Sequence, residues 1–231
     1  MPSPAPFLFL FALAAPASPT SVLHEIAEKW SDERHRWAFT QLVRESDKKG
    51  LVQERVERYD PVRGEAHRWK LISLNGRKPT PGEEETWGKR KNRPRKRDAR
   101  PLTEYLDIEH TRLLHEDDST MRLELPLRRS FGWIFPGEKV DVILTVNKQS
   151  RMIERAQVTI DGPFNVALGL ARVVDLDFDL EFSAGDKGPA VDPGADPPRG
   201  TAYAVVNKLG RRIEYSWSDF TRLPAPPDGH W

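Results

Sequence analysis

The alternation of apolar and polar residues along successive short segments constrains this fold more than any other feature of the sequence. In the segment that ends at Leu74, Trp69 and Leu71 point to one side and Lys70 to the other. Such a period of two is typical of a β-strand with one apolar face. The sequence repeats this pattern about ten times, and the predicted strands are Arg36–Glu45, Leu51–Asp60, His67–Leu74, Thr111–His115, Met121–Leu127, Lys139–Asn147, Met152–Ile160, Arg172–Phe182, Thr201–Asn207 and Arg212–Phe220.

Helical signals occur before the first strand and between the third and fourth. Apolar residues from Val22 to Trp30 share one helical face and predict an amphipathic helix that ends near Arg34. Thr80, Pro81 and Glu83 form a capping-box pattern that predicts the start of a second helix. A short helical piece is expected over Leu102–Ile108.

Short turns link most of these strands, which predicts an up-and-down antiparallel sheet. A sheet of this width curls because its strands twist, and curling around a helix buries one face. The predicted class is mostly β with α (α+β): a curled antiparallel half-barrel that covers an N-terminal helix and inserted lid helices. No change of composition divides residues 18–231, so we expect one domain, with a flexible loop over residues 184–200.

The N-terminus predicts export. An apolar run from Phe7 to Ala15 precedes a small-x-small pattern at Ala15–Ala17, so residues 1–17 are expected to be a signal peptide cleaved after Ala17. The sequence contains no cysteine, which excludes disulfides and a lipid-modified N-terminal cysteine. We therefore expect a soluble periplasmic protein.

The stretch ERYDPVRGEAHRWKLISLNGRKPT resembles the periplasmic lipoprotein-carrier (LolA/LolB-like) superfamily, as does LTEYLDIEHTRLLHEDD. The resemblance extends diffusely over most of residues 20–222. It implies an apolar concave sheet face, covered by helices that act as a lid, which receives the acyl chains of a lipoprotein or another amphiphile. It also implies a delivery partner in the inner or outer membrane and no cofactor.

The apolar positions of the predicted strands are candidates for lining such a cavity, although for any single one of them an ordinary core role is the better interpretation. The candidates are Trp37, Phe39, Val43, Trp69, Leu71, Leu123, Leu125, Val142, Leu144, Val158, Leu176 and Phe178, and Tyr203 is assigned to the same face.

Residues 88–100 concentrate basic side chains in a chain whose 36 Lys and Arg nearly balance its 35 Asp and Glu. A nucleic-acid patch is not expected in an exported protein, so no nucleic-acid partner is predicted. The segment is either a solvated loop or a contact for anionic surfaces, and the candidates for the latter are Lys89, Arg90, Lys91, Arg93, Arg95, Lys96 and Arg97.

Signals for chemistry are weak. Asp175, Asp177, Asp179 and Glu181 alternate along one strand and could hold a cation, but pairing with arginines such as Arg155 is the simpler interpretation. No catalytic signature is present, so we expect neither an enzyme nor a metal site. The sequence favours a monomeric, non-enzymatic carrier of lipid-like molecules, and the alternative is a polyanion-binding module that acts through residues 88–100.

Overall fold

A computed structural model describes residues 18–33, 37–93, 104–128, 137–166, 169–182 and 199–223. The helices and strands are α1 (Pro19–Glu33), β1 (Trp37–Asp47), β2 (Gly50–Tyr59), η2 (Pro61–Arg63), η3 (Glu65–His67), β3 (Trp69–Leu74), α2 (Pro81–Lys91), η5 (Ile108–His110), β4 (Arg112–Glu116), β5 (Thr120–Glu124), η7 (Gly137–Lys139), β6 (Val140–Asn147), β7 (Ile153–Ile160), β8 (Phe164–Val166), β9 (Ala171–Glu181), β10 (Arg199–Lys208) and β11 (Arg211–Arg222). Mostly β with α is therefore the observed class, as the sequence predicts.

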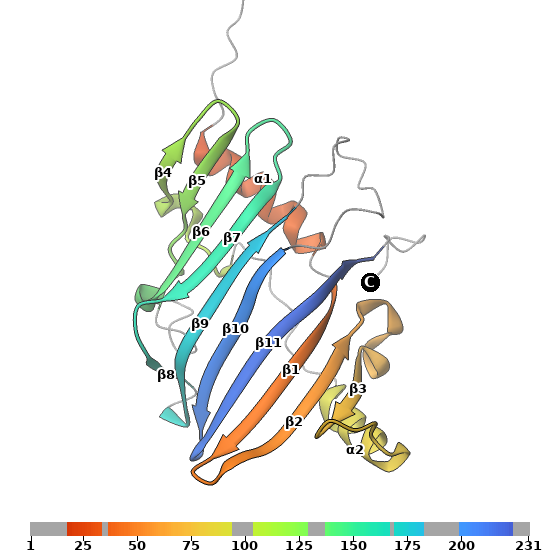
Figure 1. The fold of residues 1–231 in the computed structure, drawn as a ribbon. Helices are drawn as coiled ribbons and strands as arrows, with labels where there is room; N and C mark the ends of the chain where they lie inside the picture. Colours follow the sequence, from red (N-terminus) through yellow and green to blue (C-terminus); the bar gives the residue numbers. More distant parts are fainter. Residues whose placement is uncertain are drawn as a thin grey trace, which may run out of the picture.

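All strands belong to one antiparallel sheet in the order β3-β2-β1-β11-β10-β9-β7-β6-β5-β4, with β8 paired to β9. The sheet is open, with β3 and β4 at its two edges (Figure 1). It departs from the predicted up-and-down order at one place, because β1 pairs with β11 and the consecutive strands β3 and β4 lie farthest apart. The long connection from β3 to β4 allows this arrangement, whereas alternation alone does not specify a strand's partner.

Helix α1 lies across one half of the sheet, behind β5, β6 and β7 in the view of Figure 1. Four of its side chains, Val22, Leu23, Ile26 and Ala27, are buried in the main core cluster with residues of β5, β6 and β7. Their spacing along the helix is the apolar stripe that predicts this helix from the sequence. We call the sheet face that α1 contacts the inner face.

Helix α2 begins as predicted. The Thr80 hydroxyl accepts a hydrogen bond from the Glu83 backbone N–H, and the Glu83 carboxylate accepts one from the Thr80 N–H. Trp87 is the buried residue of this helix, which packs against β3 at the other end of the sheet.

Three local details differ from the prediction. Of the helical piece predicted over Leu102–Ile108, Leu102 and Thr103 lie outside the described residues, Glu104 and Ile108 are in 3-10 turns, and Leu106 between them pairs with Leu127 in an isolated bridge. Arg199 and Gly200, assigned to the flexible loop, open strand β10 and pair with β9. Strand β8 has no counterpart among the predicted strands, since three residues are too few to show a period.

Residues 1–17 and 183–198 lie outside the described residues, so the signal peptide and most of the predicted loop stay predictions. Within the described ranges, neither helix combines the length and apolar character that a membrane-spanning segment needs.

Candidate functional site: the inner face of the sheet

The strand registers place the candidate cavity residues on the inner face, with the exception of Tyr203. Residues that pair across an antiparallel ladder share a face, and the pairs Phe39 with Tyr59 and Tyr59 with Trp69 connect β1, β2 and β3. Further pairs continue across β11, β10, β9, β7, β6 and β5, and they include Val43 with Tyr215, Ala204 with Leu176, Phe178 with Val158, Val158 with Val142, and Leu144 with Leu123.

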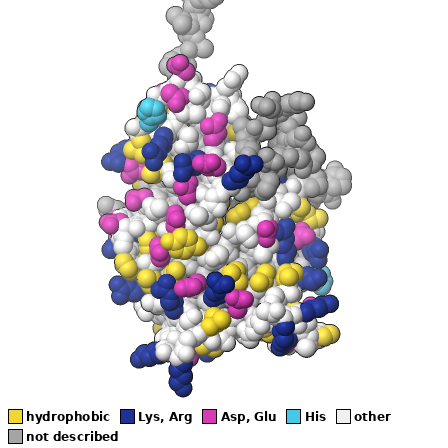
Figure 2. Space-filling view, viewed as in Figure 1, with side chains coloured by type: hydrophobic (Ala, Val, Ile, Leu, Met, Phe, Trp, Pro, Cys, Tyr) yellow, Lys and Arg dark blue, Asp and Glu magenta, His cyan; other side chains and the backbone are white. Residues whose placement is uncertain are grey.

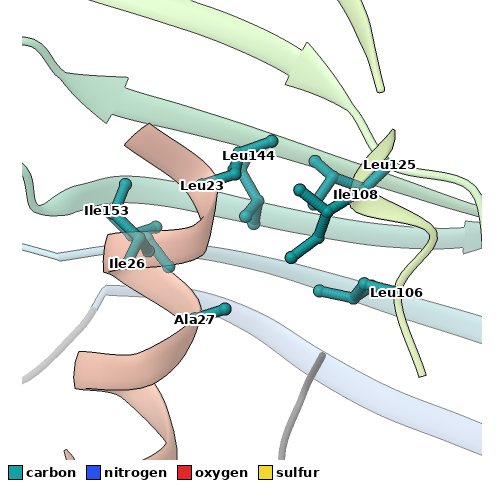
Figure 3. A pocket seen from close by; sticks show the side chains of 8 residues that line it. All are labelled: Leu23, Ile26, Ala27, Leu106, Ile108, Leu125, Leu144 and Ile153. Atoms are coloured by element: carbon teal, nitrogen blue, oxygen red, sulfur yellow. The ribbon is translucent and has the colours of Figure 1, made fainter. Parts of the chain in front are cut away.

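The half of the inner face beneath α1 is aliphatic and filled. Leu123, Leu125, Val142 and Leu144 are buried there. The side chains of α1 meet them around a void of only about 20 Å³, lined by Leu23, Ile26, Ala27, Leu106, Ile108, Leu125, Leu144 and Ile153 (Figure 3). A void of this size holds about one water molecule, so no acyl chain fits there while α1 stays in place.

The other half of the inner face is aromatic, and many of its rings are only half-buried. The rings of Phe39 and Tyr59 stack with centroids 5.0 Å apart, and Trp69 lies 5.0 Å from Tyr59. A second group joins Phe178 to Trp217 at 5.1 Å and Trp217 to Tyr215 at 5.9 Å. Burial raises the pKa of the Tyr59 and Tyr215 hydroxyls. These rings form an apolar surface with hydroxyl groups along it, which suits the body and the polar end of an amphiphile.

A buried polar cluster lies beneath α2 on the same face. The carboxylate of Glu57, which is 1% exposed, accepts hydrogen bonds from Lys91 Nζ at 2.8 Å, Arg55 Nε at 3.2 Å and Trp87 Nε1 at 3.3 Å. Arg55 also donates to Glu45 at 2.7 Å. Three donors on one buried carboxylate satisfy its charge and attach α2 to β2.

The described basic candidates differ in their surroundings. Lys91 is bound to Glu57 and lies 4.0 Å from the centroid of the Trp69 ring. Lys89 pairs with Glu85 at 2.6 Å, and Arg90 and Arg93 are exposed. Arg95, Lys96 and Arg97 lie outside the described residues.

The acidic ladder of β9 lies on the opposite, outer face. Asp179 forms two hydrogen bonds of 2.6 Å with Arg155, and this guanidinium holds the pKa of Asp179 below its usual value. Pairing with arginine is therefore confirmed for Asp179 and Glu181, whereas Asp175 and Asp177 accept hydrogen bonds from Tyr203 and Thr201. Tyr203 is wrongly assigned to the inner face, because it pairs with Asp177 and donates its hydroxyl to Asp175 at 2.9 Å. Among the described residues, no three His, Asp or Glu side chains could together hold a metal ion.

The sequence-based candidates omit four aromatic residues of the inner face, which are Tyr59, Tyr215, Trp217 and Phe220, and also the buried acid Glu57. Tyr215 and Trp217 alternate with polar residues on β11, so the same period could have identified them. Phe220 follows Asp219, whose φ of 52° interrupts the strand period. The alternation therefore does not predict on which face of the sheet the Phe220 ring lies. Glu57 gives no such signal, because a glutamate in an alternating strand normally indicates the solvent side.

Comparisons with known proteins give similarity in structure only. No family model matches the chain, and no curated protein matches it. A solved domain described as an outer membrane lipoprotein-sorting protein from Vibrio parahaemolyticus is 11% identical, with 91% of this chain and 94% of that one covered at a TM-score of 0.31. A DUF1329 family protein from Desulfovibrio piger is 10% identical over 92% and 96% of the two chains, with a TM-score of 0.32.

A LolA superfamily protein from Nitrosomonas europaea is 14% identical over 92% of this chain and 96% of that one, with a TM-score of 0.27. No residue role is carried over from any of them.

Proposed function

We propose that this protein is a non-enzymatic periplasmic carrier that binds the acyl chains of a lipoprotein or another lipid-like amphiphile on the inner face of its sheet. The observation that supports this most is the division of that face. One half presents half-buried aromatic rings, and among the described residues helix α1, together with Leu106 and Ile108, covers the aliphatic half.

In this proposal the ligand displaces helix α1 from the aliphatic half of the inner face. Among its described side chains, the four buried ones are small to medium aliphatic groups, and their transfer to water costs on the order of 6 kcal/mol. An acyl chain contributes about 0.8 kcal/mol per CH₂ that it shelters. About eight CH₂ groups therefore offset the exposure of the α1 stripe, and a longer chain binds with net gain.

The aromatic half gives the ligand a first contact without any movement of α1. The ligand's tail then replaces α1 over Leu123, Leu125, Val142 and Leu144, while the polar end stays near the Tyr59 and Tyr215 hydroxyls. Displacement of α1 breaks apolar contacts and the exposed His24–Glu109 hydrogen bond of 3.0 Å, but no covalent bond, so release to a membrane partner requires no chemical step. The binding is reversible for the same reason.

The test uses the lack of native cysteines. Leu23 of α1 and Leu144 of β6 line the same void (Figure 3), so Leu23→Cys with Leu144→Cys links the helix to the sheet on oxidation. Binding is followed by displacement of an apolar fluorescent dye with a C16 fatty acid. We expect the oxidised protein to lose binding and the reduced protein to regain it.

Two controls make this test specific. Each single cysteine variant should bind under both redox conditions, which separates the link from the substitutions. Equal binding by the oxidised and reduced double variant would exclude displacement of α1. Absence of fatty-acid binding by the unaltered protein would refute the carrier function itself.

A further inference from the structure

Three turns come together at one end of the sheet. Asp47 and Gly50 close the β1–β2 turn, Lys208 and Arg211 close the β10–β11 turn, and Val166 and Ala171 close the β8–β9 turn. The registers make them neighbours, since Ser46 pairs with Arg212 and Lys208 pairs with Ala171. Figure 1 shows all three at the lower end of the molecule. We call Asp47–Val52, Gly169–Arg172 and Lys208–Arg212 the tip surface.

Each turn presents a leucine to solvent. Leu51 is 61% exposed, Leu170 is 61% exposed and Leu209 is 78% exposed, and these are the three most exposed large apolar side chains among the described residues. Strands lie about 4.8 Å apart, so the row of turns from β2 to β8 spans roughly 24 Å. The leucines are therefore separate projections along a line and do not form a compact hydrophobic patch.

Basic residues surround these leucines. The tip surface contains six basic residues and one acid, Asp47, in a chain whose 36 basic and 35 acidic residues nearly cancel. The six are Lys48, Lys49, Arg172, Lys208, Arg211 and Arg212, and all are exposed. Figure 2 shows Lys and Arg side chains gathered at the same lower end.

Most of this positive charge is available to a partner. Arg211 pairs with Glu45 at 3.1 Å and Arg212 with Glu214 at 2.8 Å. Within the described part of the chain, no carboxylate lies within ion-pair distance of Lys48, Lys49, Arg172 or Lys208.

We propose that the tip surface docks this protein on an anionic lipid bilayer, with the three leucines inserted at the headgroup boundary and the lysines and arginines on the lipid phosphates. Apolar projections ringed by basic residues match the two contributions that hold peripheral proteins on membranes. Leucines spread over roughly 24 Å do not form the compact anchor cluster of a protein–protein hot spot. Single-stranded nucleic acid would need aromatic platforms, and the tip surface contains no aromatic residue. The proposal goes beyond the carrier function and does not depend on it.

The experiment places an environment-sensitive dye on the single cysteine of Leu51→Cys in the full chain, so that the spectrum reports on the tip surface and not on the apolar N-terminal run. Vesicles of phosphatidylcholine alone are compared with vesicles that also contain phosphatidylglycerol. We expect a blue shift only with the anionic vesicles, weakened by added salt.

Two sets of variants then separate the contributions. Lys48→Gln, Lys49→Gln and Lys208→Gln should each lower the partition coefficient about fivefold, and the triple variant about a hundredfold. The pair Leu170→Ser and Leu209→Ser should lower it about tenfold or more. The control pair Leu113→Ser and Leu114→Ser on the edge strand β4, where the leucines are also exposed, should leave it unchanged.

Three results would overturn the proposal: no shift with anionic vesicles, an equal shift with neutral vesicles, or an equal loss in the control pair. A fourth is that soluble polyglutamate competes as strongly as vesicles while the leucine variants bind normally, because the surface would then recognise an acidic macromolecule. Fatty-acid binding should be normal in every tip variant, so a failure here is distinct from a failure of the carrier function.

Discussion

Lys91 Nζ lies 2.8 Å from Glu57 Oε2 and connects the last turn of α2 to the buried side of β2. The same ammonium lies 4.0 Å from the centroid of the Trp69 ring. Lys91 belongs to the basic segment 88–100, which the sequence predicts to be solvated or to contact an anionic surface. In the structure its ammonium instead completes a buried ion pair that attaches α2 to the sheet.

Lys91→Met should lower the free energy of unfolding by about 1–3 kcal/mol, because Glu57 then keeps two of its three donors in a buried place. The measurement is urea unfolding followed by tryptophan fluorescence. Lys89→Met in the same turn is the control: its pair with Glu85 is exposed, so the change in unfolding free energy should be much smaller than for Lys91→Met. Equal effects would contradict the role assigned to Glu57.

Phe178→Glu and Leu144→Glu should weaken binding of an apolar dye or a fatty acid by about tenfold or more, because each puts a carboxylate on the face that receives the ligand. Lys70→Glu, on the outer face of β3, should leave the affinity unchanged. Circular dichroism spectra recorded alongside identify any variant that has unfolded. If all three variants are folded and lose the same amount of ligand affinity, the ligand does not bind on the inner face.

Glu83→Gln should change the acid stability of α2. Hydrogen bonds from Arg77 and the Thr80 backbone lower the pKa of Glu83 from 4.5 to about 2. The ionised carboxylate therefore stabilises the folded state above pH 4.5, and this contribution is lost as the pH falls towards 2. The difference in unfolding free energy between the protein and Glu83→Gln should be constant above that window and shrink within it. A difference in unfolding free energy that does not change with pH would contradict the lowered pKa of Glu83.

Gly200→Ala should destabilise the protein by about 2–4 kcal/mol. Gly200 has a φ of 133°, and an added Cβ would lie 1.9 Å from the carbonyl oxygen of Asp179. Gly82→Ala in the first turn of α2 is the opposite case: nothing lies within 4 Å, and alanine should stabilise by about 0.5–1 kcal/mol. Thermal unfolding of both variants tests the pairing of residues 199–200 with β9.

Local patterns predict the elements of this fold well and their arrangement less well. Alternation locates β1 and β9 to within two residues, and the capping box locates α2, because both signals depend on neighbours in the chain. The pairing of β1 with β11 depends on residues far apart in sequence, which no local period encodes. The same limit applies to the site: periodicity places Leu144 and Phe178 on one face, but only packing shows that α1 fills the space above the first of them.

The contact between β1 and β11 has a consequence for biogenesis. Strand β1 leaves the ribosome or an export channel long before β11, so its hydrogen-bonding edge must wait for the last strand of the sheet. Pairing over such a sequence separation slows folding, and an unpaired edge invites association with other chains. Protein shortened ahead of Arg211 should therefore aggregate rather than form a smaller sheet, and a chaperone that shields the waiting edge should raise the yield of folded protein.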